Sequence, residues 1–167
     1  MKLIRRNTFE TNSSSTHSIT IPKKIDEIYK TKRPLIRFNI GEFGWEWSKY
    51  ELKDYIWTAI CSNFEDNIEE YKEKIKHILS PYYEEIEFEE PIIEISKDGK
   101  YKWLESGCID HGYELTDFLK DIFDNENLFI NAILKGYVMT GNDNEEQPKW
   151  FDYIDDKDDC YHYFKGN

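Results

Sequence analysis

The chain has 167 residues, of which 39% are hydrophobic, 16% aromatic and 34% charged, and its formal net charge is −12. This content of apolar and aromatic side chains excludes an intrinsically disordered chain, and the length suits a single domain over residues 1–167. We see no apolar run of the ~18 residues that a membrane-spanning helix needs, no signal peptide, and only three widely spaced cysteines, so we expect a cytoplasmic protein without disulfides.

The charge is distributed unevenly along the chain. Residues 1–37 carry a net charge of +6, and residues 38–167 carry −18. A protein this negative repels phosphates in bulk, so we expect no direct binding to nucleic acid. The acidic part fits two roles: it keeps the protein soluble, or it docks on a basic partner as a mimic of nucleic acid would.

The first elements expected along the chain are short strands. Residues 2–6 form one, and residues 17–22 form another, in which His17 and two isoleucines alternate with Ser18 and Thr20. Residues 34–40 predict a third strand. The glycine-punctuated segment 41–47, GEFGWEW, indicates a loop.

Two helices are expected next. Ser48 and Glu51 have the spacing of a capping box, which predicts a helix beginning there. Its apolar side chains recur at helical spacing: Leu52, Tyr55, Ile56, Ala59 and Ile60. The second helix has the same pattern over residues 68–79, and Pro81 ends it.

The second half of the chain mixes strands with one further helix. We expect one or two strands in 84–96 and a strand at 100–104 that pairs back through the turn 97–100. A helix follows at 114–123, and then one or two strands in 127–143. The tail at 145–167 is acidic and aromatic, and we assign it no secondary structure. Together these elements predict the α+β class: a small, mostly antiparallel sheet packed against two or three helices.

The polar run from Thr11 to Thr16, followed by His17, is the first candidate site. Such side chains stabilise ordinary turns, and successive backbone N–H groups with hydroxyls also make anion-binding nests. In the second interpretation the ligand-binding residues are Arg5, Arg6, Glu10, Asn12, Ser13, Ser14 and Ser15. His17 would transfer protons, because imidazole titrates near neutral pH. A serine beside a histidine also begins a nucleophile–base pair, but neither a G-x-S-x-G nor a Walker motif is present.

Two more stretches carry candidate residues. In CIDHG, Asp110 and His111 place a carboxylate beside an imidazole, which indicates either a turn or a catalytic acid–base pair that meets His17 across the sheet. In GEFGWEW, Trp45 either packs under the loop or stacks on a ligand ring, and Glu42 would hydrogen-bond a ligand hydroxyl or amine.

A zinc site is the alternative for the cysteines. Cys108-x-x-His111 and Cys160-x-His162 offer two thiols and two imidazoles. Each pair is mixed, and C-x-H is tighter than the usual ligand spacing, so we expect no metal there. The sequence identifies no cofactor.

The segment RRNTFETNSSSTHSITI, with GEFGWE, CIDHG and TGNDN further on, resembles a family of small uncharacterised proteins of phages and Firmicutes-type bacteria. Members of that family begin with a near-identical F-E-T-N-S-S-S-x-H-S segment. The resemblance implies a phage-type accessory protein in the host-cell cytoplasm and, by analogy, a role against bacterial defence. It implies no particular chemistry.

Three functions follow as expectations. The first is a small-ligand site that binds, and as a further option cleaves, a phosphate-containing molecule such as a nucleotide. The second is an acidic, anti-CRISPR-like inhibitor that docks on a basic host nucleic-acid enzyme. The third is a structural or assembly protein without a ligand. We favour the first, because a mimic needs neither a histidine nor a hydroxyl-rich loop beside arginines.

Overall fold

The computed structural model describes residues 15–24, 31–63, 67–110, 115–142, 146, 148 and 159–165. Within these ranges the helices are α1 (Leu52–Asn63), α2 (Ile68–Leu79), α3 (Leu115–Asp124) and α4 (Glu126–Lys135). The strands are β1 (Ser15–Pro22), β2 (Arg33–Phe38), β3 (Glu42–Phe43), β4 (Ser48–Glu51), β5 (Tyr83–Phe88), β6 (Ile93–Ile95), β7 (Lys102–Leu104), β8 (Cys108–Ile109), β9 (Tyr137–Asn142) and β10 (Cys160–Lys165).

The largest sheet of the described part has four strands in the order β10-β1-β9-β4, and all neighbours are antiparallel. Three smaller pairs accompany it: β2 with β5 and β3 with β8, both parallel, and the antiparallel β6–β7 hairpin. Helices and mostly antiparallel strands confirm the α+β class predicted from the sequence.

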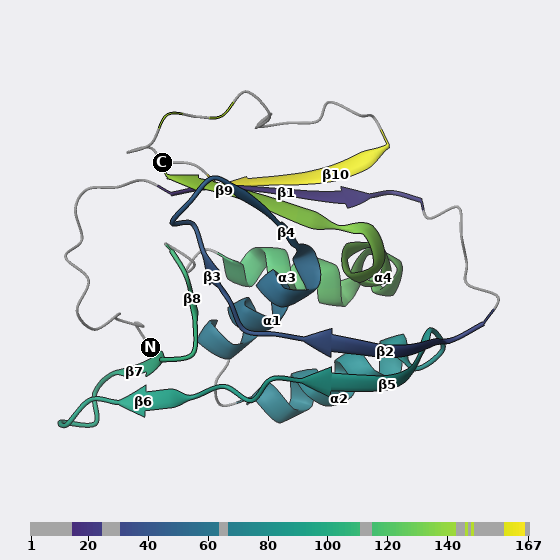
Figure 1. Cartoon of the computed structure of the whole chain (residues 1–167). Helices are drawn as coiled ribbons and strands as arrows, with labels where there is room; N and C mark the ends of the chain where they lie inside the picture. The colour runs from purple at the N-terminus through teal and green to yellow at the C-terminus, as the bar shows by residue number, and fades with distance from the viewer. Residues whose placement is uncertain are drawn as a thin grey trace.

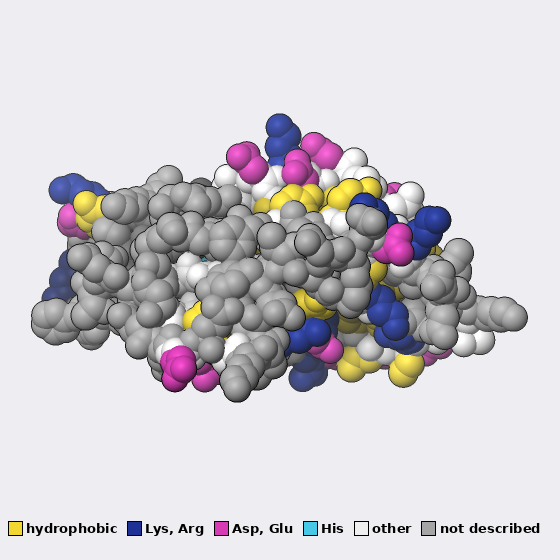
Figure 2. All heavy atoms as spheres, turned by 90° about the horizontal axis from the view of Figure 1, so that it is seen from above, with side chains coloured by type: hydrophobic (Ala, Val, Ile, Leu, Met, Phe, Trp, Pro, Cys, Tyr) yellow, Lys and Arg dark blue, Asp and Glu magenta, His cyan; other side chains and the backbone are white. Residues whose placement is uncertain are grey.

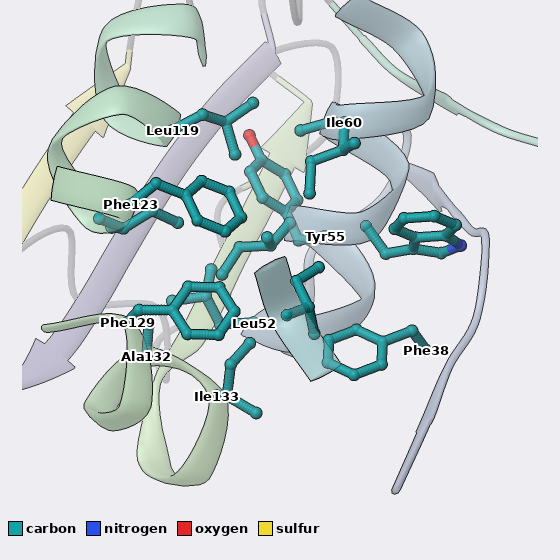
Figure 3. Close-up of a cluster of buried hydrophobic side chains, with 14 of the residues drawn as sticks. Phe38, Leu52, Tyr55, Ile60, Leu119, Phe123, Phe129, Ala132 and Ile133 are labelled. Atoms are coloured by element: carbon teal, nitrogen blue, oxygen red, sulfur yellow. The ribbon is translucent and has the colours of Figure 1, made fainter. Parts of the chain in front are cut away.

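Helices α1, α3 and α4 lie between the four-stranded sheet and the β2–β5 pair, and α2 packs beside β5 (Figure 1). Helix α1 contacts both strand layers as well as the other three helices. It is therefore buried on nearly every side, and Trp57 and Thr58 are covered in addition to the expected apolar face. Figure 3 shows the centre of this core, where Leu52, Tyr55 and Ile60 of α1 face Leu119, Phe123 and Phe129.

Several expected elements are confirmed. The periodic apolar patterns at residues 68–79 and around 114–123 form α2 and α3, and the turn at 97–100 joins β6 to β7. At that turn Gly99 has a φ of +71°, a conformation that glycine adopts without a steric penalty. Residues 17–22 belong to β1, which begins two residues earlier, at Ser15.

Two expected elements are wrong, and the loop expected at 41–47 contains the short strand β3, which pairs with β8. Ser48 and Glu51 do not cap a helix: residues 48–51 form β4, whose backbone pairs with the edge of β9, and α1 begins only at Leu52. Residues 127–135, expected as strand, belong to α4. The side chain of Asn125 caps this helix by accepting from the backbone N–H of Leu128, and Gly136 follows its last turn.

Two expected features lie outside the described residues. These are the strand at 2–6 and residues 11–14 of the polar run; the last two residues of that run, Ser15 and Thr16, were expected in the loop but begin β1. The acidic tail is described only in part, and its residues 160–165 form β10, the edge strand beside β1.

Candidate functional site

The first residues of β1 form a chain of polar contacts with α1. Ser15 and His17 are two positions apart on one strand, so their side chains share the face that looks toward the helices. The Oγ of Ser15 lies 3.0 Å from Nε2 of His17, and the hydroxyl of Tyr55 lies 3.1 Å from Nδ1 of the same ring. All three residues are at most 2% exposed.

The positions of the hydrogens in this chain follow from its acceptors. The hydroxyl of Ser15 donates to the backbone carbonyl of Asp110 over 3.2 Å. A serine hydroxyl has one hydrogen, and a carbonyl can only accept. The oxygen of Ser15 is therefore the acceptor in its contact with His17, and Nε2 of His17 carries a hydrogen. His17 thus donates to Ser15 in this arrangement and does not withdraw its proton.

Gly44 marks the point where three separate parts of the chain meet. The parallel pairing of β3 with β8 continues with a hydrogen bond from Asp110 N to Phe43 O (2.9 Å), so the residues after both strands lie together. Gly44 has a φ of +104°. A Cβ on Gly44 would lie 2.8 Å from Cβ of Asp110 and 3.1 Å from Nε2 of His17. Only glycine permits this close approach.

Tyr55 connects this polar chain to the hydrophobic core. Its ring packs edge-on against Phe43, with 5.1 Å between centroids, and in Figure 3 it stands among apolar side chains, near Leu119 and Ile60. Burial raises the pKa of Tyr55 far above its ordinary value, because the phenolate would lose its hydration. Tyr55 therefore keeps its hydrogen and is available as a donor.

The structure brings some of the predicted site residues together. Ser15, His17 and Asp110 lie together, and the contact of Asp110 with Ser15 is made by its backbone carbonyl. A catalytic role for the CIDHG segment stays a prediction. Trp45, half-buried, directly follows Gly44. Glu42 is exposed on β3, where it pairs with Cys108 of β8. The remaining predicted residues lie outside the described ranges: Arg5, Arg6, Glu10, Asn12, Ser13, Ser14 and His111.

The sequence analysis missed two members of the cluster. Tyr55 counted only as an apolar position of its helix, although a buried tyrosine hydroxyl requires a hydrogen-bond partner and so points to a polar neighbour. Gly44 counted only as part of a loop. Its positive φ and its close neighbours depend on the fold, and no feature of GEFGWEW distinguishes Gly44 from Gly41 in this respect.

The described residues contain no group of three or more His, Cys, Asp or Glu side chains placed to hold a metal ion. Cys61, Cys108 and Cys160 form no disulfide within the described part of the chain. The two histidines of the zinc alternative lie outside the described part: His111 altogether, and His162 with its side chain. In the same part of the chain, no helix has the length and hydropathy needed to cross a membrane.

Several described acidic side chains are paired with basic ones. Lys72, itself buried, bonds Glu69 and Glu90 at 2.8 and 2.7 Å. Lys76 pairs with Glu73, and Arg37 with Glu87. Figure 2 looks down on the side of the four-stranded sheet, and there the visible acidic and basic side chains are interspersed. At these ion pairs and on the visible described part of this face, acidic and basic side chains are therefore mixed.

Comparisons with protein-family models, with curated proteins and with solved structures found no match for this chain. The interpretation of the site therefore depends on the contacts of its own residues.

Proposed function

We propose that this protein binds a phosphate-containing small molecule, such as a nucleotide, at the N-terminal end of β1. The observation that carries the proposal is the convergence of three separate chain segments at Gly44: Ser15 and His17 from β1, Trp45 from the loop after β3, and Asp110 from the turn after β8. Ligand sites commonly form where loops from several elements meet over a rigid scaffold.

The phosphate contacts are assigned to residues that come before this point in the chain. Ser13 and Ser14 adjoin Ser15 in sequence and supply hydroxyl and amide donors, and Arg5 and Arg6 supply the charge that a phosphate needs. These roles come from the sequence. The described contacts support them by anchoring Ser15 through Asp110, so that the end of the polar segment has a defined position.

The hydrogen-bond directions favour binding over a covalent serine mechanism. A nucleophilic serine needs a base that accepts its proton, whereas His17 here donates to Ser15, and Ser15 donates to Asp110. Cleavage of the ligand remains a second part of the proposal, and it is assigned to Asp110 and His111 as an acid–base pair acting on water.

Isothermal titration with ATP, ADP, AMP and inorganic phosphate tests the proposal. The double substitution Arg5→Ala and Arg6→Ala is expected to weaken binding of the best ligand about tenfold or more, because two charge-assisted contacts are lost. The matched control removes another adjacent basic pair, Lys23→Ala and Lys24→Ala, which follows the far end of β1 and is exposed. Lack of binding by every phosphate compound, or equal losses in both variants, contradicts the proposal.

The acidic inhibitor remains the alternative proposal. The interspersed charges of the described surfaces do not favour it, and most of the acidic run at 145–159 lies outside the described residues. A salt-sensitive, stoichiometric complex in a pull-down from host lysate that is lost when Asp155, Asp156, Asp158 and Asp159 are neutralised would favour it. If neither ligand nor complex is found, the structural or assembly role is the one left.

A further inference from the structure

We infer that Tyr55 is a positioning residue, whose hydroxyl donates to Nδ1 of His17 and holds the imidazole in the tautomer with its hydrogen on Nε2. Two contacts carry this inference: Tyr55 to Nδ1 at 3.1 Å and Ser15 to Nε2 at 3.0 Å. The two ring nitrogens of a neutral histidine differ, because one donates and the other accepts.

The hydrogen positions are assigned from the contact between Ser15 and Asp110, because a backbone carbonyl can only accept. The carbonyl of Asp110 takes the single hydrogen of Ser15, so Nε2 must donate to Ser15. In neutral His17 the remaining nitrogen, Nδ1, is then an acceptor, and the protonated phenol of Tyr55 is its donor. All hydrogens therefore run in one direction, from Tyr55 through His17 and Ser15 to Asp110.

Protonation of His17 does not reverse its contact with Ser15. An imidazolium carries hydrogens on both nitrogens, so Nδ1 would donate to the oxygen of Tyr55 while Nε2 still donates to Ser15. Ser15 is consequently held as a hydroxyl in both states of His17.

The packing around Tyr55 fits a fixed donor. Its side chain is fully buried, and its ring is tilted by 51° against that of His17 with 5.7 Å between centroids. Phe43 packs on it from β3, the strand that leads to Gly44. A tyrosine confined in this way has few alternative orientations for its hydroxyl, and it links α1 to two of the three segments that meet at Gly44, through His17 of β1 and Phe43 of β3.

For the function, the inference deepens the proposal above and rests on it. Tyr55 supplies the donor to Nδ1 of His17, at the opposite end of the contacts from the Asp110 carbonyl, and so helps to hold His17 in the tautomer that anchors Ser15. Its loss would therefore loosen the end of β1, where the ligand is proposed to bind, without removing any group that touches the ligand.

Nitrogen-15 NMR of the imidazole rings in the full-length protein, without ligand, tests the tautomer directly. The wild type is expected to show Nε2 of His17 protonated and Nδ1 unprotonated near neutral pH, with the signals assigned by their loss in His17→Gln. An unprotonated Nε2 beside a protonated Nδ1 overturns the inference, and this measurement needs no variant of Tyr55.

Tyr55→Phe removes only the hydroxyl and is expected to shift the His17 ring toward the other tautomer or a mixture. Tyr50→Phe is the matched control, because Tyr50 also packs edge-on against Phe43 but bonds Glu46 instead, and it should leave the His17 shifts unchanged. An unaltered tautomer in a folded Tyr55→Phe protein contradicts the inference.

Binding of ATP then separates the inference from the proposed function. Tyr55→Phe is expected to weaken ATP binding about threefold to tenfold, the effect of losing one neutral hydrogen bond. If the wild type binds no ATP, the proposed function fails while the tautomer result stands. If ATP binds and the tautomer does not respond to Tyr55→Phe, the inference fails alone.

Discussion

The Oγ of Ser15 accepts a hydrogen bond from Nε2 of His17, two residues further along the same strand, over 3.0 Å. Both side chains lie on the inner face of β1, and the single hydrogen of Ser15 goes on to the carbonyl of Asp110. One hydroxyl therefore connects His17 of the same strand, which in turn contacts Tyr55 of α1, to a turn far away in the sequence.

Replacing Ser15 by alanine is expected to be costly for this reason. In the Ser15→Ala variant the buried Nε2–H of His17 loses its acceptor and the carbonyl of Asp110 loses its donor. These losses should lower the free energy of unfolding by about 1–3 kcal/mol. Urea denaturation followed by fluorescence measures it. Ser62→Ala is the control, because Ser62 is only half-buried near the end of α1. A loss at Ser15 no larger than at Ser62 would show that the contact contributes no stability.

Gly44 and Gly99 allow backbone strain to be separated from crowding. Both have positive φ, +104° and +71°, but a Cβ at Gly99 meets nothing within 4 Å, while one at Gly44 meets Asp110 and His17. Gly99→Ala should cost about 1 kcal/mol, from the backbone alone. Gly44→Ala should cost about 1–3 kcal/mol more, because the neighbours must also move.

Chemical denaturation of both variants in parallel measures the difference. Equal losses at the two glycines would mean that the segments around Gly44 are not packed together as described. If Gly44→Ala is the more stable of the two, the close approach of His17 and Asp110 to this residue is refuted.

The stability of the protein should fall at alkaline pH. Burial raises the pKa of Cys61 from 9.0 to about 12 and raises that of Tyr55 above 10.0. Above about pH 9 the unfolded chain therefore releases protons that the folded chain keeps, so stability is full below pH 9 and is lost progressively as the pH rises toward 12.

Tyr55→Phe measures the share of one group in this loss. Each group with a raised pKa lowers the free energy of unfolding by up to about 1.4 kcal/mol per pH unit. Above pH 10, the free energy of unfolding of Tyr55→Phe should therefore fall less steeply with pH than that of the wild type, by up to about this amount. Tyr101→Phe changes an exposed tyrosine and serves as the control. Urea denaturation between pH 8 and 11 gives both slopes, and parallel curves for Tyr55→Phe and the wild type would argue against a buried, protonated phenol.

The cap of α4 gives a test of the element that the sequence analysis assigned wrongly. Asn125→Ala removes the acceptor of the Leu128 N–H and should cost about 1 kcal/mol, whereas Asn125→Asp retains a side-chain oxygen and should cost less. Circular dichroism during thermal unfolding compares the two. An alanine variant as stable as the wild type would contradict the cap.

The misassignment at residues 127–135 has a physical cause. Leu128, Phe129, Ile130, Ala132 and Ile133 are all buried in α4. A short run with this many apolar positions satisfies the spacing of a buried strand as well as that of a buried helix, so periodicity alone does not distinguish them. The cap at Asn125 and the packing of α4 on β1 and α3 decide for the helix.

The error at Ser48–Glu51 has a different cause. Its capping-box spacing is a local preference worth little energy, and a cap forms only if the serine stands at the helix start. In the fold these four residues pair with β9, which satisfies their backbone groups along a sheet edge. Pairing over a sequence distance of about ninety residues is invisible to a local pattern, and it outweighs the local preference.

What the sequence determined by itself is local. Periodic apolar side chains specify α1, α2 and α3, the turn at 97–100 specifies the β6–β7 hairpin, and the alternation at 17–22 puts His17 on one face with two isoleucines. The fold extends that strand to Ser15, which brings Ser15 onto the same face. Only the tertiary structure decided that Tyr55, Gly44 and Asp110 reach that face, because each comes from another part of the chain. It also decided the direction of the hydrogen bonds, since the carbonyl that takes the hydrogen of Ser15 lies 95 residues away.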